Sequence, residues 1–353
     1  MNEEPKVSII IGCYNVERWL RNGRLNDIYN QTFKDWELIL VDDGSTDETP
    51  TLLDAEAKND SRIIVIHKRN GGLGSARNAG LDIARGKYVW SFDLDDHVDS
   101  KCIEYCVKEA DNRQVDVLMF GFNAITVNVN KNRIEKIQLC ETLINTNREL
   151  RDSYLDRILF VPNGNGFFWN KFYKRSFIEK NKLRFGNQRI QQDECFNLKV
   201  YMYLEKCYIS PKVFYDYYIY NNGNNRSKFL PNRFDIYKSV RHHFEQLKTF
   251  WRVEDSRFVD YLNNRFYNGV MQCVIFNLLH FDCTWTKKRQ KEEMDRIMND
   301  PLTMEAFNYA EKHYCSIEQK LYRMACRHKS LCAIKLLNKI FEIMRVVKKV
   351  IIK

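Results

Sequence analysis

The chain of 353 residues lacks the signatures of several large protein classes. None of its eleven cysteines forms a C-x-x-C pair, and no G-x-x-x-x-G-K-[ST] phosphate-binding loop is present. The third glycine of a dinucleotide-binding loop is also missing, because Gly72-x-Gly74-x-x ends in Arg77. No hydrophobic signal segment precedes Pro5, and the cysteines have no pairing rhythm, so we expect a cytosolic protein with reduced thiols.

The net positive charge is concentrated at the C-terminal end. The formal net charge is +10, yet residues 320–353 contain ten Lys or Arg and the single acid Glu342, which leaves about +1 for all other residues. This end of the chain shows none of the patterns of a nucleic-acid recognition module, and we therefore expect no nucleic-acid partner.

The first hundred residues alternate between predicted strands and helices. Continuous apolar runs predict buried parallel strands at 7–11, 37–41, 63–66 and 88–92, separated by helical stretches at 17–31, 47–58 and 72–85. The fold class is therefore α/β, with an open sheet. Residues 111–230 have an α+β pattern with a strand at Val115–Phe120, and residues 231–353 have helical periodicity with few Gly or Pro.

Polar clusters follow three of the predicted strands. They are Gly12-Cys13-Tyr14-Asn15, Asp42-Asp43-Gly44 and Asp93-Leu94-Asp95-Asp96. Ligands of open α/β sheets bind outside the carboxyl ends of the strands, so we expect these clusters to meet at one edge. Each cluster taken alone is equally compatible with an ordinary polar turn.

The three carboxylates at positions 93, 95 and 96 repel one another unless a cation lies among them. Mg²⁺ and Mn²⁺ take oxygen ligands and commonly bind substrate phosphates at the same time. The pattern therefore favours a divalent metal site, with an acidic turn as the alternative.

Six motifs in order resemble those of GT-A fold glycosyltransferases of family 2, of the bacterial polysaccharide-biosynthesis type. The resemblance runs from Pro5 to about Ser227. The motifs are Val7-Ser8-Ile9-Ile10-Ile11-Gly12-Cys13-Tyr14-Asn15, Leu40-Val41-Asp42-Asp43-Gly44-Ser45-Thr46-Asp47, Gly74-Ser75-Ala76-Arg77-Asn78-Ala79-Gly80, Phe92-Asp93-Leu94-Asp95-Asp96, Trp169-Asn170-Lys171-Phe172-Tyr173 and Gln192-Asp193-Glu194-Cys195-Phe196. Four residues depart from the family pattern: Gly12, Cys13, His97 and Gln192.

The resemblance implies a Rossmann-like nucleotide-diphospho-sugar transferase fold with a C-terminal helical extension. It divides the chain into a nucleotide-sugar-binding half at 1–110, an acceptor-binding half at 111–230 and a helical region at 231–353. It also implies Mn²⁺ or Mg²⁺ as cofactor, held by Asp95 and Asp93.

Donor-binding and acceptor-binding residues follow from the same resemblance. The implied donor-binding residues are Tyr14, Asp42, Asp43, Arg77, Asn78 and Asp96. The implied acceptor-binding residues are Trp169, Lys171 and Glu194. Arg77 either contacts the donor or forms an ion pair that supports the acidic loop. Trp169 either stacks on a sugar or packs in the core.

Asp193 is the candidate general base, with Glu194 as the fallback. An inverting transfer needs a carboxylate that takes the proton of the acceptor hydroxyl as this attacks the anomeric carbon. The alternative is that Asp193 caps the helix that follows it.

The implied function is inverting, metal-dependent transfer of a sugar from a nucleotide-sugar, UDP-linked, to a saccharide or lipid-linked saccharide in surface-polysaccharide biosynthesis. One alternative is a non-catalytic glycan-binding or membrane-binding module on the same scaffold. Another is a sugar-phosphate nucleotidyltransferase, which would carry a G-x-G-x-R loop after the first strand, where this chain has Gly12-Cys13-Tyr14-Asn15.

Residues 331–353 predict an amphipathic helix with a basic polar face. Lysines recur too often in it for a membrane-spanning helix. We expect this helix either to lie on the anionic inner face of a membrane, as a peripheral contact, or to pack on the other C-terminal helices.

Overall fold

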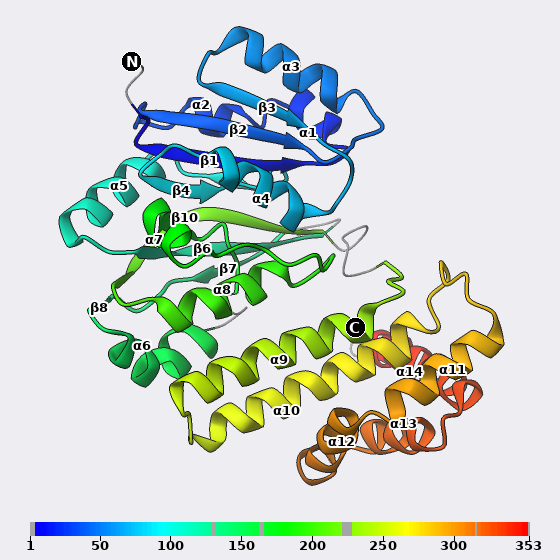
Figure 1. The fold of residues 1–353 in the computed structure, drawn as a ribbon. Helices are drawn as coiled ribbons and strands as arrows, with labels where there is room; N and C mark the ends of the chain where they lie inside the picture. The colour runs from blue at the N-terminus through cyan, green and yellow to red at the C-terminus, as the bar shows by residue number, and fades with distance from the viewer. Residues whose placement is uncertain (1–3, 129–131, 162–165, 221–227, 315, 352–353) are drawn as a thin grey trace. The chain divides into compact units, whose positions relative to one another are not determined.

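The computed structural model describes residues 4–128, 132–161, 166–220, 228–314 and 316–351 (Figure 1). The chain forms two compact units, Met1–Asn222 and Gly223–Lys353. The predicted division into a donor-binding half, an acceptor-binding half and a helical region, with boundaries at residues 110 and 230, stays a prediction. One sheet includes strands from both sides of residue 110.

The first unit is built on a ten-stranded sheet. Its order is β3-β2-β1-β4-β9-β6-β10-β5, with β7 beside β6 and β8 beside β10. The strands are β1 Val7–Cys13, β2 Trp36–Asp42, β3 Ile63–His67, β4 Tyr88–Ser91, β5 His97–Val98, β6 Val117–Val127, β7 Arg133–Ile137, β8 Thr142–Ile144, β9 Lys171–Lys174 and β10 Cys207–Tyr220.

The four strands predicted in the first hundred residues are confirmed as β1 to β4, and they pair in parallel. All seven residues of β2 are buried, as the apolar run 38–41 predicts for a strand covered on both faces. Strand β1 pairs with β2 on one side and with β4 on the other. The chain order reverses there, and the carboxyl ends of β1 and β4 therefore flank the position where such sheets bind ligands.

Helices connect these strands. They are α1 Glu17–Arg21, α2 Asn26–Tyr29, α3 Thr49–Asn59, α4 Leu73–Ile83, α5 Cys102–Arg113, α6 Asn147–Tyr154, a π-helical turn Leu155–Leu159, α7 Arg175–Lys180 and α8 Gln192–Tyr203. The single helix predicted over 17–31 is wrong, because α1 and α2 are separate. Gly23 adopts φ +71° between them, a conformation that ends a right-handed helix.

Strand β10 is 14 residues long and irregular. Its register against β6 shifts between Ile209 and Val213 and again between Val213 and Tyr215. Beyond these bulges, the rings of Tyr215 and Tyr217 both stack on Trp169. Because side chains alternate along a strand, Tyr218 and Tyr220 lie on the opposite face.

The second unit consists of helices, drawn from yellow-green to red in Figure 1. They are α9 Arg233–Trp251, α10 Ser256–Met271 with a π-helical turn Gln272–Asn277, α11 Lys287–Met298, α12 Pro301–His313, α13 Ile317–Arg327 and α14 Leu331–Ile351. The predicted helical character of this region is thus confirmed. Several helices start at side-chain caps, including a capping box at Ser316 with Gln319.

Helix α14 has two apolar stripes with different surroundings. Ile334 and Phe341 lie in the core of the helical unit. The other stripe is exposed and comprises Leu336, Ile340, Ile343 and Met344. Packing on the neighbouring helices, one of the two expected positions, therefore accounts for only one stripe. Across the described ranges, no helix is both long enough and apolar enough to span a membrane.

Candidate active site

The loops that follow β1 and β2 are joined by hydrogen bonds. Cys13 and Asp42 are register partners at the ends of these strands. The backbone N–H of Asn15 donates to Ser45 Oγ at 3.0 Å, and the N–H of Thr46 donates to Asn15 Oδ1 at 2.8 Å. The predicted convergence of these two clusters is therefore observed. Tyr14 projects from this double loop with 51% of its surface exposed.

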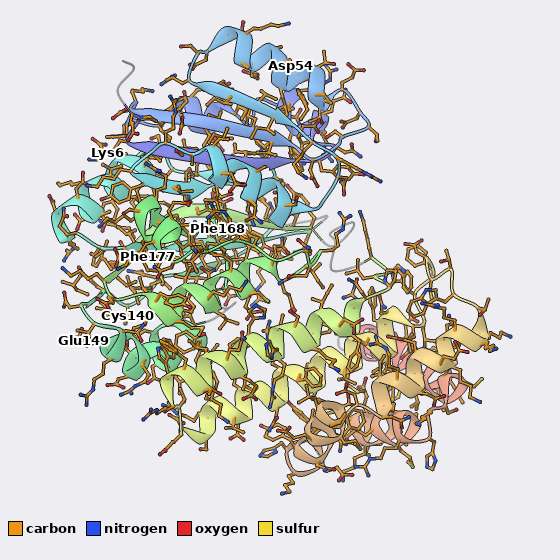
Figure 2. The ribbon with its side chains drawn as sticks, viewed as in Figure 1. Lys6, Asp54, Cys140, Glu149, Phe168 and Phe177 are labelled. Atoms are coloured by element: carbon orange, nitrogen blue, oxygen red, sulfur yellow. The ribbon has the colours of Figure 1, made fainter. Side chains whose placement is uncertain are left out.

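Asp42 is buried at the end of β2, and both of its carboxylate oxygens have partners. Oδ1 accepts the N–H of Ser45 at 2.9 Å, and Oδ2 lies 3.0 Å from His67 Nδ1. Burial alone would raise the pKa of Asp42, but the hydrogen bonds from Ser45 and His67 hold this pKa below its usual value. The other ring nitrogen of His67 contacts Asp54, which Figure 2 labels on α3.

Asp43 holds the loop that leads into α4. Its Oδ1 accepts from Lys68 Nζ at 2.7 Å and from the N–H of Gly71 at 2.9 Å. Its Oδ2 accepts from the N–H of Gly72 at 2.6 Å. Gly72 adopts φ +88°, a conformation that favours glycine. Asp43 thus fixes the start of the helix that carries Arg77.

The carboxylates after β4 have different surroundings. Asp95 is exposed, and it forms no ion pair with any residue that the structure describes. The surrounding protein desolvates it and Asp93 repels its charge, so that the pKa of Asp95 rises to about 6. Burial also raises the pKa of Asp93, and the positive charge of Arg77 opposes that rise.

Asp96 is buried and connects the acidic loop to β10. Its Oδ2 accepts the hydroxyl of Tyr215 at 2.9 Å, and its Oδ1 accepts the N–H of Tyr218 at 2.8 Å. The same Tyr215 hydroxyl accepts the N–H of Asp93 at 3.2 Å. Burial, followed by repulsion from Asp95 and Asp93, raises the pKa of Asp96 well above its usual value. Asp96 therefore positions the loop through β10.

Arg77 is fully buried and joins the acidic loop to α8. Its Nη2 donates to Asp93 Oδ1 at 3.0 Å, and its Nη1 donates to Asp193 Oδ1 at 2.6 Å. Although burial disfavours its charged form, Asp193 and Asp93 keep the pKa of Arg77 above its usual value. The guanidinium also lies 5.5 Å from the ring centre of Phe168, which Figure 2 labels. Of the two expected roles, the structure shows the ion pair that supports the loop.

Asp193 lies in the first turn of α8. The N-cap position is occupied by Gln191, so the alternative that Asp193 is itself the N-cap does not apply. Its Oδ2 accepts the N–H of Phe168 at 3.1 Å, while its Oδ1 accepts from Arg77. The carboxylate is thus held from two sides and remains partly exposed, at 18% of its side chain.

The predicted acceptor-binding residues have different degrees of burial. Trp169 is 2% exposed and stacks on Tyr215 with ring centres 4.2 Å apart. Lys171 is fully buried, and its Nζ donates to the carbonyl of Phe167 at 2.6 Å and to Asn170 Oδ1 at 2.9 Å. Burial lowers the pKa of Lys171 to about 7, although Asp193 acts in the opposite direction. Glu194 is half-buried beside Asp193.

Asn78, predicted to bind the donor, pairs with the backbone of Phe185. Its Nδ2 donates to the Phe185 carbonyl at 3.1 Å, and its Oδ1 accepts the Phe185 N–H at 2.9 Å. These two bonds use one donor and one acceptor of the amide. They attach the segment before α8 to α4.

Sequence reasoning missed the residues that hold Phe167 and Phe168 in place. Asn197 donates to the carbonyls of Gly166 and Phe167 at 2.9 and 3.0 Å, and it accepts the hydroxyl of Tyr173 at 2.6 Å. Asn197 lies four residues after Asp193 on α8, a spacing that places two residues on one helix face. This spacing in the sequence could have identified Asn197 as a residue close to Asp193.

The acidic loop fits a metal that is shared with substrate phosphates better than a metal enclosed by protein. Within the described ranges, no group of three or more His, Cys, Asp or Glu side chains is placed to hold an ion. Asp95 and the second oxygen of Asp93 provide hard carboxylate ligands. Mg²⁺ is often held by one or two carboxylates, with phosphates and waters completing its octahedron.

Known proteins match both the sequence and the fold. The sequence model described as "Glycosyl transferase family 2" matches residues 8–181. The glycosyltransferases EpsH and EpsJ of Bacillus subtilis are 30% and 32% identical to this chain. These alignments cover 62% and 64% of this chain, and the same shares of EpsH and EpsJ. The match thus spans less than two thirds of either relative.

A solved structure matches over nearly the whole length. The S. aureus TarS 1-349 structure in complex with UDP-GlcNAc has a TM-score of 0.61 at 19% identity. The alignment covers 96% of this chain and 91% of TarS 1-349. The fold is therefore GT-A with a helical C-terminal region. Residues 8–181 match the model of glycosyltransferase family 2, and the chain resembles the glycosyltransferases EpsH and EpsJ.

Proposed function

We propose that the protein transfers a sugar from a nucleotide-sugar, with UDP as the nucleotide, to a saccharide or lipid-linked saccharide acceptor, with inversion at the anomeric carbon. The product would enter a bacterial surface polysaccharide. The observation that carries this proposal is the Arg77 bridge, which brings Asp93 of the acidic loop and Asp193 of α8 to one guanidinium. On this proposal, the site of the leaving group and that of the base would be adjacent.

The donor nucleoside would lie at the ends of β1 and β2. Tyr14 offers an exposed ring on which a base can stack, and the buried Asp42 keeps a low pKa and a negative charge beside it. Release of Asp42 from Ser45 or His67 would let it accept an imide N–H of uracil. The complexes of TarS with UDP and UDP-GlcNAc support UDP as the nucleotide.

Asp193 would act as the base. The acceptor hydroxyl attacks the anomeric carbon, its proton passes to Asp193, and the bond from the anomeric carbon to the diphosphate oxygen breaks, releasing UDP. The Phe168 N–H and Arg77 hold this carboxylate in position.

Asp95 and Asp93 would hold Mn²⁺ or Mg²⁺ against the diphosphate, and the bound ion would stabilise the negative charge of the leaving group. Asp96 and Tyr215 keep the loop in shape for this purpose, because they fix its backbone to β10.

The decisive experiment is a panel of nucleotide-sugars with Mn²⁺, scored for slow donor hydrolysis and for binding by calorimetry, on wild type and Asp193→Asn. We expect one UDP-sugar to be hydrolysed, and Asp193→Asn to lose at least 100-fold in turnover while its UDP affinity stays within about threefold. The exposed acid Asp152 on α6 provides the control variant Asp152→Asn, which should behave as wild type. Unchanged turnover in Asp193→Asn would remove this residue from the mechanism. Binding without turnover by wild type would favour a glycan-binding module.

We also propose that the exposed stripe of α14 contacts an anionic membrane surface. Leu336, Ile340 and Ile343 offer apolar surface, and the exposed Lys335 and Lys339 are on the same helix. Each lysine near an anionic surface contributes roughly 1 kcal/mol.

This contact is tested by sedimentation with vesicles of phosphatidylcholine alone or with 30% phosphatidylglycerol. We expect binding only to the anionic vesicles, and loss of binding in the double variant Ile340→Ser/Ile343→Ser. Met324→Ser removes an exposed apolar side chain from α13 and serves as the control. Equal sedimentation of the double variant and wild type would contradict the proposal.

A further inference from the structure

Three aromatic side chains and Arg24 gather next to the acidic loop without belonging to the site described above, and the exposed Arg18 also lies over the ring of Trp19, 5.1 Å from its centre. Trp19 lies on α1, Arg24 in the turn before α2, and Tyr218 and Tyr220 near the end of β10. The ring centres of Trp19 and Tyr220 are 6.0 Å apart, and those of Tyr218 and Tyr220 are 6.3 Å apart with an interplanar angle of 20°. We call these four residues the aromatic–arginine cluster.

The cluster differs from a packed core in its exposure. All four residues are half-buried. On the other face of β10, by contrast, Tyr215 is fully buried against Trp169. Amphipathic rings that keep part of their surface in solvent can stack on the apolar face of a sugar ring, as buried rings cannot.

Arg24 carries a charge with no carboxylate in direct contact within the described ranges. Its guanidinium carbon lies 5.6 Å from the ring centre of Trp19 and 5.9 Å from that of Tyr218, and it forms no ion pair there. The nearby Asp27 is paired with His97 instead, at 2.8 Å. Contact with rings orients a guanidinium and leaves its N–H groups for a bidentate bond to phosphate or carboxylate.

The cluster is close to the reaction centre. The N–H of Tyr218 donates to Asp96, one residue from Asp95. A group held by the cluster would therefore lie beside the bound donor.

We propose that the aromatic–arginine cluster is an acceptor subsite for a saccharide residue that carries an anionic group, a phosphate or a carboxylate. The rings of Trp19 and Tyr220 stack on the sugar, and Arg24 pairs with the anion. This assignment rests on the proposed glycosyl transfer. It adds a substrate class, an anionic glycan, and residues that none of the six motifs contains.

The test uses the full chain with UDP and Mn²⁺ present, titrated with four probes and followed by NMR. The probes are methyl β-glucoside, its 6-phosphate, methyl β-glucuronide and inorganic phosphate. We expect the 6-phosphate or the glucuronide to bind at least tenfold more tightly than the neutral glucoside and than inorganic phosphate. Arg24→Gln should remove that tenfold preference. Trp19→Ala and Tyr220→Ala should weaken binding of every glycoside by about fivefold or more.

Arg21→Gln is the matched control, because Arg21 is an exposed arginine of α1 already paired with Glu17. It should leave the preference intact. Failure of wild type to prefer the anionic glycosides, or to bind any of the glycosides, would overturn the subsite. So would an Arg24→Gln variant that loses UDP affinity tenfold but keeps the preference, because Arg24 would then serve the donor diphosphate. Wild-type donor hydrolysis and UDP binding are measured separately, so failure of the subsite is distinguishable from failure of the proposed function.

Discussion

Arg77 and Asp193 are 116 residues apart in the sequence, and Nη1 of the arginine lies 2.6 Å from Oδ1 of the aspartate. The same guanidinium holds Asp93. The acidic loop and the start of α8 are therefore held in one position by a single buried cation. Any movement of the acidic loop would therefore also displace Asp193, the carboxylate proposed as the base.

The variant Arg77→Met should destabilise the protein by about 3–5 kcal/mol, because it leaves two partly buried carboxylates without their cation. Arg77→Lys keeps the charge but lacks the planar fork, so it should recover part of that stability and little of the activity. Urea unfolding and donor hydrolysis measure the two effects. In the double variant Arg77→Met/Asp193→Asn, the added loss of stability should be smaller than the sum of the single losses. Strict additivity would mean that the ion pair contributes nothing.

Asp95→Asn should abolish the effect of Mn²⁺ on UDP binding, because an amide is a poor ligand for a hard cation compared with a carboxylate. We expect UDP affinity with Mn²⁺ to fall at least tenfold, to the level that wild type shows in EDTA. Calorimetry with and without EDTA measures this. The neighbouring exposed Asp99 gives the control variant Asp99→Asn, which should retain the metal effect. A metal effect of wild-type size in Asp95→Asn would show that other ligands suffice.

The lowered pKa of the buried Lys171 should make the stability of the protein depend on pH. Its pKa is about 7 in the folded protein and roughly 10.4 in an unfolded chain, so between these values the unfolded state binds more protons. Lys171 should therefore contribute a rise in the free energy of unfolding with pH from about 7 to 10, of at most about 1.4 kcal/mol per pH unit. This rise should be missing in Lys171→Met and present in Lys108→Met, which changes an exposed lysine of α5. Parallel curves for wild type and Lys171→Met would contradict the lowered pKa.

Gly80 lets α4 pack closely on β1. A Cβ at this position would lie 2.5 Å from Cγ2 of Ile10. Gly80→Ala should therefore cost about 1–3 kcal/mol through overpacking and should shift the helix that carries Arg77. Shortening the opposing side chain in Gly80→Ala/Ile10→Val removes Cδ1, not Cγ2, and should give only partial relief. Gly80→Ala/Ile10→Ala removes both and should relieve the clash further. Thermal unfolding, with each double variant compared with its own Ile10 single variant because shortening Ile10 is itself destabilising, and donor hydrolysis test this order. A stable, fully active Gly80→Ala would show that the contact can relax.

The parts of the site that depend on the period and ends of the strands could be predicted from the sequence. Strands β1, β2 and β4 are continuous apolar runs, and parallel pairing brings their carboxyl ends together, so the convergence of Tyr14, Asp42 and Asp93 followed from local pattern. The separation of α1 from α2 could not be predicted in this way, because one glycine with positive φ, Gly23, outweighs the helical periodicity around it.

The contact partners of individual side chains could not be predicted from the sequence. Trp169 and Lys171 belong to a motif that suggested contact with substrate, whereas the sheet buries both. Burial of a lysine depends on which strands flank β9, and that order is set by long-range pairing. The bridge from Arg77 to Asp193 likewise depends on where α4 and α8 meet. No local spacing encodes a contact between segments so distant in sequence.

The alternation of side chains along β10 limits where residues can be inserted in this strand. Tyr215 and Tyr217 face Trp169, and Tyr218 and Tyr220 face Trp19 and Arg24. Inserting one residue between Tyr217 and Tyr218 would turn Tyr218 and Tyr220 towards the face of Trp169 and leave Tyr215 and Tyr217 in place, whereas inserting two would restore the order. Homologous transferases that accept other glycans should therefore differ here in side-chain identity, while the number of residues between the two tyrosine pairs changes only in steps of two.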